Sequence, residues 1–430
     1  MCGFVGFLND KSSDYDNQKT IKSMADRIAH RGPDEEEYYC DNDISLGFRR
    51  LSIIDLDGGS QPITNEDETK VLVSNGEIYN FMSLRDDLTK KGHVFKTKTD
   101  SEVILHGYEE YGKELLNKLR GMFSFVIWDR AEKKLFGARD IFGIKPFFYY
   151  LKNENFLFGS EIKSFLSNPM FEKELNVERL PDYLCFEYIP SCETMFKNVY
   201  KLPPGCCFTW QDGELKIDKY FEMKYNIDDS KDLEYWENLI EKTFEQSTLA
   251  HGISDVEVGC FLSSGVDSSY VVNQMAKNND VKTFSVGYEE EKYSELKHAQ
   301  NFANVANVQN FSKKVSADEY FDIASTVQYY MDEPLPNPSA IVLYFLTKLA
   351  SEQVKVVLSG EGADELFGGY NYYKEPLDFE KYQKLPLTLR KLISGVAVKI
   401  PNIKGKRFLV RGSMPIEKRY IRNNYVFDHT

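Results

Sequence analysis

The 430-residue chain lacks the segments that mark membrane-spanning and secreted proteins. Its apolar runs, such as 341–346 and 396–400, fall far short of the ~18 residues that a membrane span requires. The first ten residues, MCGFVGFLND, hold neither a basic segment nor a long apolar stretch, so no secretory signal is expected. Positive charges are also outnumbered by negative ones. The 53 Lys and Arg stand against 67 Asp and Glu, a formal net charge of −14, which argues against binding to nucleic acid phosphates.

Cysteine and histidine are few, and their spacing does not predict a metal or disulfide site. The 7 Cys include no CxxC pair, and none of the 6 His shows metal-ligand spacing, so neither a disulfide framework nor a zinc site is expected. With 42% hydrophobic and 14% aromatic residues, however, the composition is that of a folded protein. We therefore expect a cytoplasmic protein of two or three domains at ~150 residues each.

Short β-rich runs separated by turn signals dominate the first half of the chain. These runs are VLVSNGEIY (71–79), MFSFVIWD (122–129), KKLFGARD (133–140), PFFYYL (146–151) and NFLFGS (155–160). Helical periodicity is confined to intervals such as 84–91 and 102–111. Many strands with few helices predict stacked antiparallel sheets flanked by helices. The Pro- and Gly-rich stretch 201–215 is predicted to end this unit.

Strands and helices alternate after about residue 218. Predicted strands cover 256–262, 282–286 and 354–358, and predicted helices cover 233–249, 294–305 and 341–351, with another from about Ser268. This alternation predicts a parallel sheet with helices on both faces.

A cysteine follows the initiator methionine. Methionine is removed before small residues, which would leave Cys2 with a free α-amine beside its own thiol. That amine titrates near ~7.7–8, so at neutral pH it can take the thiol proton without a histidine partner. The alternative is that position 2 is a cysteine by chance.

Polar residues in the motifs that follow could complete a site around this nucleophile. The side-chain amide of Asn75 and the backbone N–H of Gly76, in a predicted polar turn, could form an oxyanion hole. Arg50, predicted at the head of a strand, could bind the carboxylate of an amino acid, and Glu77 and Asp100 its ammonium group. Each also has a simpler interpretation: Asn75-Gly76 as a hairpin turn, Asp100 as a helix N-cap, and Arg50 as a surface charge.

Over residues 1–215 the chain resembles the class II glutamine amidotransferases, the N-terminal-nucleophile glutaminases. The ordered motifs CGFVGF, HRGPD, RRLSIID, NGEIYN, TDSEVIL, GMFSF, RDIFGIKPFFYY and GSEIKSF carry this resemblance. It implies an α+β domain over 2–215, a four-layer αββα sandwich that hydrolyses glutamine to glutamate and ammonia. In this comparison Cys2 is the nucleophile, and Asn75 and Gly76 form the oxyanion hole. The residues implied to hold glutamine are Arg50, Ile54, Asn75, Gly76, Glu77 and Asp100.

A Ser- and Gly-rich turn, FLSSGVDSS (261–269), joins a predicted strand to a predicted helix. Its backbone N–H groups and the positive end of the helix dipole suit a phosphate. No lysine follows the glycine, so a Walker A site is not expected, and Asp267 would act through a bridging Mg²⁺. The alternative is an ordinary strand-to-helix turn with serine N-caps.

A second loop, VVLSGEGADELFGGY (356–370), again follows a strand. Together the two loops resemble the PP-loop ATP pyrophosphatase domain of asparagine synthetases, an α/β domain that adenylates a carboxylate and releases pyrophosphate. The resemblance implies ATP and Mg²⁺, with Asp267 and Asp364 holding the metal and Glu361 acting as a base near the acyl-adenylate. The residues implied to contact ATP are Phe261, Leu262, Ser263, Gly265, Asp267, Ser268, Val286, Gly287, Ser359 and Gly360. The segment DEPLPNPSA (332–340) also matches a family segment near this site.

The chain departs from this family pattern at two points. The family reads Ser-Gly-Gly where this chain has Ser264 in the middle, and a positive φ there would cost a serine about 1–2 kcal/mol. Synthetases of this type also continue well beyond the second loop, to a lysine that neutralises phosphate charge, whereas this chain stops at Thr430. We therefore predict an ATP-binding domain over 219–430 that is incomplete at its C-terminal end, with a basic, helix-like region over 376–430.

Together the two halves predict glutamine-dependent asparagine synthesis, in which ammonia made at Cys2 displaces AMP from adenylated aspartate. Two alternatives stay open: amidation of another carboxylate, such as a cell-wall or surface-polysaccharide precursor, and a truncated form with glutaminase activity or ligand binding only. The predicted partners are glutamine, aspartate or the other carboxylate, and ATP, without nucleic acid or membrane. A homodimer is compatible with the sequence.

Overall fold

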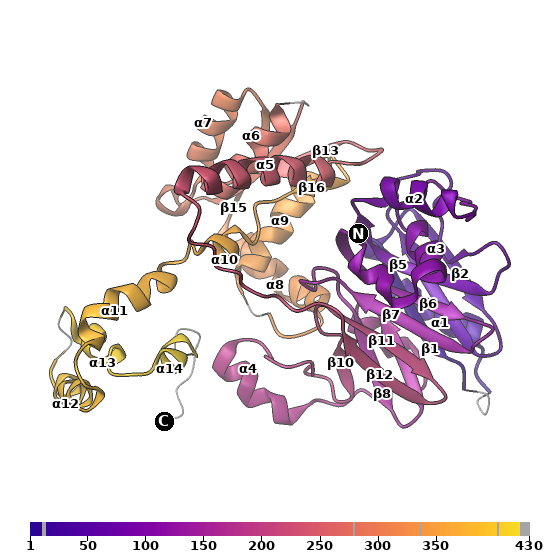
Figure 1. The fold of residues 1–430 in the computed structure, drawn as a ribbon, viewed down its shortest axis with the longest axis horizontal. Helices are drawn as coiled ribbons and strands as arrows, with labels where there is room; N and C mark the ends of the chain where they lie inside the picture. Colours follow the sequence, from indigo (N-terminus) through magenta and orange to yellow (C-terminus); the bar gives the residue numbers. More distant parts are fainter. Residues whose placement is uncertain (11–13, 278–279, 336, 402–403, 422–430) are drawn as a thin grey trace.

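The structure is a computed structural model that describes residues 1–10, 14–277, 280–335, 337–401 and 404–421 (Figure 1). Antiparallel sheets form the N-terminal part, and a parallel sheet with its helices forms the next part. A group of short helices follows toward the C-terminus and lies apart from both in Figure 1. The short 3-10 helices are η1 Ala29–Arg31, η2 Gly112–Asn117, η3 Ile162–Ser167, η4 Val177–Arg179, η5 Glu291–Tyr293 and η6 Asn371–Lys374.

The N-terminal part holds two antiparallel sheets. The first has the order β10-β8-β9-β1-β3-β2 and the second has the order β12-β11-β7-β6-β5-β4. The strands of the first are β1 Gly3–Leu8, β2 Glu35–Cys40, β3 Ile44–Arg50, β8 Phe148–Lys152, β9 Asn155–Gly159 and β10 Val199–Lys201. The strands of the second are β4 Ile63–Thr64, β5 Lys70–Ile78, β6 Gly121–Asp129, β7 Lys134–Arg139, β11 Cys206–Gln211 and β12 Glu214–Lys219.

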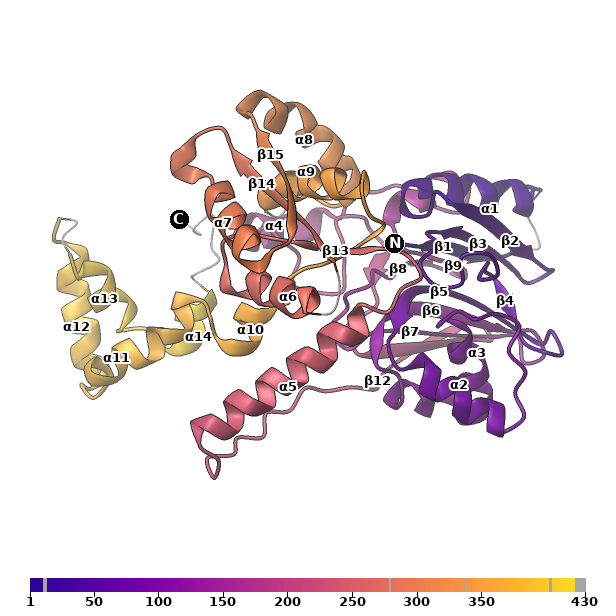
Figure 2. The same ribbon diagram turned by 90° about the horizontal axis from the view of Figure 1, so that it is seen from above.

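Alternating side chains divide these sheets into four layers, as predicted. Along β1, Phe4 packs in the core between the two sheets, whereas Val5 packs on the outer side against helix α1 (Asn17–Asp26). Along β5, Val73 faces the other sheet and Leu72 faces the helices α2 (Phe81–Lys90) and α3 (Glu102–Tyr111). Figure 2 shows α1 and the pair α2 and α3 on opposite sides of the two sheets. The αββα sandwich is confirmed.

Two local predictions in this part were wrong. Asn75 and Gly76 do not form a turn but lie inside β5, paired with Ser124 and Phe123 of β6. The turn preference of Asn-Gly is overridden because both residues lie within the long pairing of β5 with β6, which runs from Lys70 to Ile78. Arg50 is the last residue of β3 rather than the first of a strand.

The second part is built on the parallel sheet β15-β14-β13-β16. Its strands are β13 Val258–Phe261, β14 Lys282–Tyr288, β15 Gln309–Val315 and β16 Val356–Leu358, and its helices are α5 Leu233–His251, α6 Val266–Ala276, α7 Leu296–Ala306, α8 Ala317–Met331 and α9 Ser339–Ser351. One core joins β13 to α5, α6 and α7, and other cores join the sheet to α8 and α9, so helices cover both faces as predicted (Figure 2). The sequence analysis predicted neither α8 nor β15. The strand β15 has no clear apolar pattern, because it is half polar and lies at the edge of the sheet.

The remaining helices are α4 Leu180–Phe186, α10 Ala363–Phe367, α11 Glu375–Gln383, α12 Leu387–Val398, α13 Lys406–Arg411 and α14 Ile416–Ile421. Of these, α4 lies between β9 and β10 of the N-terminal part, and the others follow β16. The region 376–430, predicted to be helix-like, is largely helical up to Ile421, and residues 422–430 lie outside the described part. None of the described helices combines the length and apolar character that a membrane crossing needs.

Candidate active sites

Cys2 lies at the entry to β1, where backbone groups surround its thiol. The N–H of Leu51 donates to Cys2 Sγ at 3.4 Å, and the thiol donates to the carbonyl of Leu51 at 3.6 Å. Arg31 Nε donates to the carbonyl oxygen of Cys2 at 2.9 Å, and Arg31 Nη2 is buried without a partner among the described residues. Burial raises the pKa of the Cys2 thiol, so the sulfur needs a base before it can attack a substrate.

An amine lies next to this thiol. In the structure Met1 precedes Cys2, and burial lowers the pKa of its amino group from about 8.0 to about 6. An amine with such a pKa is largely unprotonated at pH 7 and can accept a proton.

Asn75 and Gly76 supply donors from the strand β5, which packs beside β1. The side chain of Asn75 is 1% exposed, and its Nδ2 has no hydrogen-bond partner among the described residues. A buried donor without an acceptor is costly, and a role in catalysis is one explanation for such a group. Gly76 has no space for a side chain, because a Cβ there would lie 2.4 Å from the carbonyl oxygen of Met122.

Glu77 and Asp100 place two buried carboxylates in the same site. The N–H of Ile78 donates to Asp100 Oδ2 at 2.7 Å, which ties the loop before α3 to β5. Burial raises the pKa of both carboxyl groups, and Asp100 raises the pKa of Glu77 further by charge repulsion. Their charges also act on the Cys2 thiol, so all three groups are close together. A cationic ligand such as an α-ammonium group would relieve this repulsion.

Arg50 and Ile54 are brought together, but the guanidinium is occupied by the chain itself. Arg50 is 4% exposed, so it is not a surface charge. Its Nη1 donates to Glu35 Oε1 at 2.7 Å, and its Nη2 donates to the carbonyls of Ile54, at 3.3 Å, and Asp55. Arg50 therefore holds the loop after β3 in place, and this loop carries the Leu51 amide that contacts Cys2.

Lys145 is a residue of this site that sequence analysis did not single out. It is 3% exposed, burial lowers its pKa, and the charges of Glu77, Arg31 and Cys2 act on it. The carboxylate of Asp140 positions it by accepting the backbone N–H of Lys145 at 3.0 Å. Both residues lie in the motif RDIFGIKPFFYY, which carries the family resemblance but does not by itself indicate a role for either.

A buried ion network runs from Cys2 to the second part of the chain. Arg31, which binds the Cys2 carbonyl, also donates to Glu161 at 2.9 Å. Glu161 pairs with Lys163, and Lys163 pairs with Asp332 at 2.8 Å. Burial opposes the ionisation of Glu161, but its cationic neighbours lower its pKa to about 2. The segment 332–340 was expected near the nucleotide loops, and its Pro336 lies outside the described residues. Its first residue, Asp332, instead contacts the N-terminal half, where its carboxylate accepts the backbone N–H of Ile162.

We expect Asp332→Asn to weaken this contact between the two parts. The amide keeps the shape of the side chain but removes the charge that Lys163 faces in a buried position, with side-chain exposures of 3% and 6%. The free energy of unfolding should fall by about 1.5–3 kcal/mol, measured by denaturant titration. Asp322→Asn, at an exposed position of α8, is the matched control. Equal stability of the two variants would contradict the role of this ion pair.

The nucleotide-type loops converge at the carboxyl edge of the parallel sheet. Strands β13 and β16 are neighbours, with Cys260 opposite Leu358, so the loops that follow them emerge side by side. Gly360 packs on the start of α6, because a Cβ there would lie 2.7 Å from the backbone nitrogen of Ser268. Ser263 Oγ and Ser268 Oγ are 2.8 Å apart across the first loop.

The other predicted nucleotide residues lie at the same edge. Phe261 ends β13 opposite Phe284 of β14, and the N–H of Leu262 donates to the carbonyl of Phe284 at 2.9 Å. Val286 and Gly287 follow on β14, and Gly265 is the N-cap of α6. On the second loop, Ser359 Oγ donates to Glu361 Oε1 at 3.1 Å.

Asp267 and Asp364 both lie in the first turn of a helix, on α6 and α10 respectively. Because these helices follow the paired strands β13 and β16, both carboxylates belong to the same edge of the sheet. Ser264 is not among the described residues with a positive φ, so the strain considered for a serine at this position does not arise.

Comparisons with known proteins match the two halves of the chain to two families. The glutamine amidotransferase domain family matches residues 1–221, and the asparagine synthase family matches residues 239–414. Asparagine synthetase [glutamine-hydrolyzing] 1 of Bacillus subtilis is 41% identical over 435 residues, covering 100% of this chain and 68% of that protein. A putative asparagine synthetase of Mycobacterium tuberculosis is 37% identical, covering 98% of this chain and 69% of that protein. A putative relative from Methanocaldococcus jannaschii is 32% identical, covering 93% and 81%. Over its whole length, the chain therefore belongs to the family of glutamine-hydrolysing asparagine synthetases.

Proposed function

We propose that the chain makes asparagine from aspartate, ATP and glutamine. Family membership supports a glutamine-dependent, ATP-dependent ligase, and the names of the relatives point to aspartate as the acceptor. Cys2 would hydrolyse glutamine to glutamate and ammonia. ATP would adenylate the side-chain carboxylate of aspartate with release of pyrophosphate, and ammonia would then displace AMP.

The glutaminase step rests on the arrangement around Cys2. Once Met1 is removed, the α-amine of Cys2 would be the base that takes the thiol proton. The sulfur then attacks the carboxamide carbon of glutamine, and the developing oxyanion accepts hydrogen bonds from Asn75 Nδ2 and the N–H of Gly76. Glu77 and Asp100 would bind the α-ammonium, with Arg50 and Ile54 fixing the loop beside the substrate. The observation that carries this step is the buried, unpartnered Nδ2 of Asn75 on the strand beside β1.

We expect Asn75→Ala to lower kcat for glutamine hydrolysis by about 10²–10³-fold, because one oxyanion donor is lost. KM for glutamine should change little if the donor acts mainly in the transition state. Asn117→Ala, at an exposed position, is the matched control, and glutamate release is the measurement. A variant with wild-type kcat would contradict the oxyanion role.

The synthetase step is proposed for the two loops at the sheet edge. Phe261, Leu262, Ser263, Gly265, Ser268, Val286, Gly287, Ser359 and Gly360 would contact ATP, and the Ser264 hydroxyl could add a bond to the pyrophosphate. Asp267 and Asp364 fit a Mg²⁺ ion, because they offer carboxylate oxygens from the same edge of the sheet. The ion would supply positive charge to the departing pyrophosphate. Glu361 would accept a proton as ammonia attacks the acyl-adenylate.

Product stoichiometry tests this proposal. With glutamine, aspartate and ATP, the chain should release glutamate, asparagine, AMP and pyrophosphate in equal amounts. Pyrophosphate release with a different carboxylate, but not with aspartate, would favour the alternative acceptor. Glutamate release without ATP–pyrophosphate exchange would favour a glutaminase without synthetase activity.

The domain limits and the assembly also stay proposals. We place the glutaminase domain at residues 2–215 and the synthetase domain at 219–430. The last strand of the N-terminal sheets, β12, continues past residue 215 and ends at Lys219. A homodimer is the simplest assembly, and sedimentation measurements would test it.

A further inference from the structure

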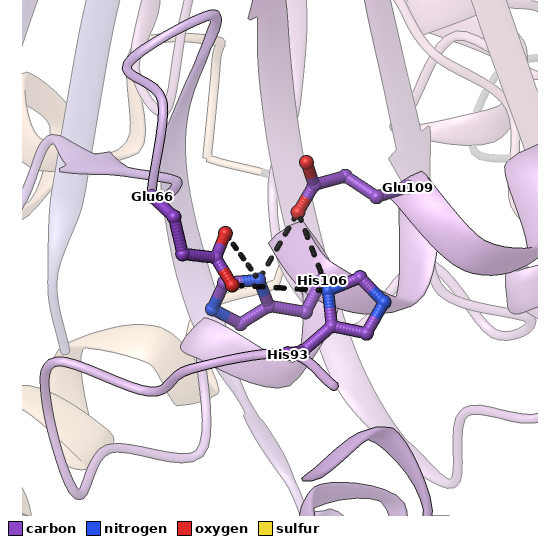
Figure 3. A group of neighbouring side chains, drawn as sticks. All are labelled: Glu66, His93, His106 and Glu109. Atoms are coloured by element: carbon purple, nitrogen blue, oxygen red, sulfur yellow. Dashed lines mark hydrogen bonds and ion pairs between the residues drawn. The ribbon is translucent and has the colours of Figure 1, made fainter. Parts of the chain in front are cut away.

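Two histidines and two glutamates, none of them a residue of the two candidate active sites, gather around the helix α3 (Figure 3). Glu66 lies between β4 and β5, His93 lies between α2 and α3, and His106 and Glu109 lie on α3. One side-chain ligand atom from each of the four lies within 4.8 Å of the others. This grouping corrects the sequence-based view that the histidines have no metal-ligand arrangement, because the four residues come from three separate segments.

The spacing of these atoms approaches that of a tetrahedral metal site. His106 Nδ1 lies 3.1 Å from Glu109 Oε2 and 3.6 Å from Glu66 Oε2. His93 Nδ1 lies 3.8 Å from Glu109 Oε2 and 4.0 Å from Glu66 Oε1. Bonds of ~2.0–2.2 Å to a central ion would set neighbouring ligand atoms roughly 3.3–3.6 Å apart. The ligand atoms of the remaining pairs lie within 4.8 Å of one another, so the four side chains would draw closer together around an ion.

The outward-facing nitrogen of each histidine points at a further carboxylate. His106 Nε2 is 3.4 Å from Glu102 Oε1, and His93 Nε2 is 3.6 Å from Glu110 Oε2. A histidine that ligates a metal almost always donates its other N–H to such an acceptor, which fixes the ring and the tautomer. His106 therefore has the outer hydrogen-bond partner that a ligand needs, and the outer nitrogen of His93 has a carboxylate nearby. The ion would replace the proton that His106 Nδ1 shares with Glu109 Oε2 at 3.1 Å.

The two glutamates are also anchored through one oxygen each. Asn65 Nδ2 donates to Glu109 Oε1 at 2.7 Å, and the N–H of Val94 donates to Glu66 Oε1 at 2.7 Å. The second oxygen of each carboxylate, Oε2, faces His106. Glu66, Glu109 and His106 are thus each held by a hydrogen bond on the far side, and His93 has the Glu110 carboxylate near its outer nitrogen.

We propose that Glu66, His93, His106 and Glu109 bind one zinc ion that stabilises the fold. Two imidazole nitrogens select zinc or a related transition metal over Mg²⁺ or Ca²⁺, which prefer oxygen ligands. Four protein ligands leave no open position for a substrate, so the ion is structural. It would join the β4–β5 loop, the α2–α3 loop and α3, the helix that directly follows Asp100.

Protonation of His106 would compete with metal binding at this position. Burial disfavours the charged imidazole, but hydrogen bonds with Glu102 and Glu109 outweigh burial and raise the pKa of His106 to about 9. An imidazolium in this position would balance part of the carboxylate charge without a metal. Direct metal measurements separate the two cases.

The test uses the untagged, full 430-residue chain. Elemental analysis of protein from zinc-supplemented cells should give about one zinc per chain. After chelation and dialysis, adding Zn²⁺ at ~100 times its dissociation constant should raise the thermal midpoint by about 5–10 °C. Co²⁺ in its place should give the intense visible absorption of a tetrahedral site, a readout that a merely exposed histidine would not produce.

Matched variants locate the site. His93→Gln and Glu109→Gln should each lose the zinc and the thermal shift, whereas the exposed controls His298→Gln and Glu114→Gln should keep both. If the wild-type chain neither retains nor binds zinc, or if His93→Gln binds it as well as wild type, the proposal is overturned. Because the decisive zinc titration uses the wild-type chain, a variant that fails to fold does not affect it. The outcome is independent of glutaminase and synthetase activity.

Discussion

Cys2→Ala should abolish glutamine-dependent asparagine formation while ammonia-dependent formation survives. The variant lacks the sulfur that attacks the carboxamide, so glutamate release should fall by about 10⁴-fold or more. The ATP-dependent step is proposed for loops at the edge of a different sheet, so it should continue when ammonium salts replace glutamine. Both reactions are followed through asparagine and pyrophosphate release.

Cys192→Ala is the matched control for this experiment. Cys192 is a free, exposed cysteine of the same half of the chain, and its removal should leave both activities unchanged. Loss of the ammonia-dependent reaction in Cys2→Ala would contradict the separation of the two sites. Glutamate release at the wild-type rate would remove Cys2 from the mechanism. N-terminal mass determination of the active wild-type protein should find that the chain begins with Cys2.

Gly360→Ala should disable the synthetase step and spare the glutaminase step. An added Cβ would lie 2.7 Å from the backbone nitrogen of Ser268 and 2.8 Å from the backbone carbon of Asp267. Backbone atoms cannot rotate aside as a side chain can, so the two loops must separate. A displacement of about 1 Å in a site that orients reactants can cost ~10²-fold in rate. We therefore expect ATP–pyrophosphate exchange with aspartate to fall by about this factor.

Gly395→Ala provides the control for the same chemical change. Gly395 lies on α12, and an added Cβ there would have no heavy atom within 4 Å. This variant should keep both activities, with a small gain in helix stability. If Gly360→Ala retains full exchange activity, the close packing of the second loop on α6 is not required for ATP use. If it also loses glutamate release, the damage extends beyond the nucleotide loops.

Local pattern predicted most of the framework. The strands β6 to β9 and the helix α3 follow from alternating or helical periodicity, because each buries one face against a neighbouring layer. The motifs also pointed to Cys2, Asn75 and Asp100, because each of these residues belongs to a short motif whose residues are adjacent in the sequence. Errors arose where tertiary pairing overrides a local preference, as for the Asn-Gly pair inside β5, and where an edge strand needs little apolar character, as for β15.

The sequence by itself determined the two fold classes, the order of the two halves and the residues of the family motifs, because these depend on periodicity and on residues close together in the chain. Only the tertiary structure decided that Arg50 is buried among loop carbonyls, that Lys145 lies beside Cys2, and that Asp332 pairs with Lys163. It also decided that Glu66, His93, His106 and Glu109 share one position. These contacts join segments that are far apart in the sequence. Which residues meet depends on how the layers pack, and a single sequence carries no local signal of that packing.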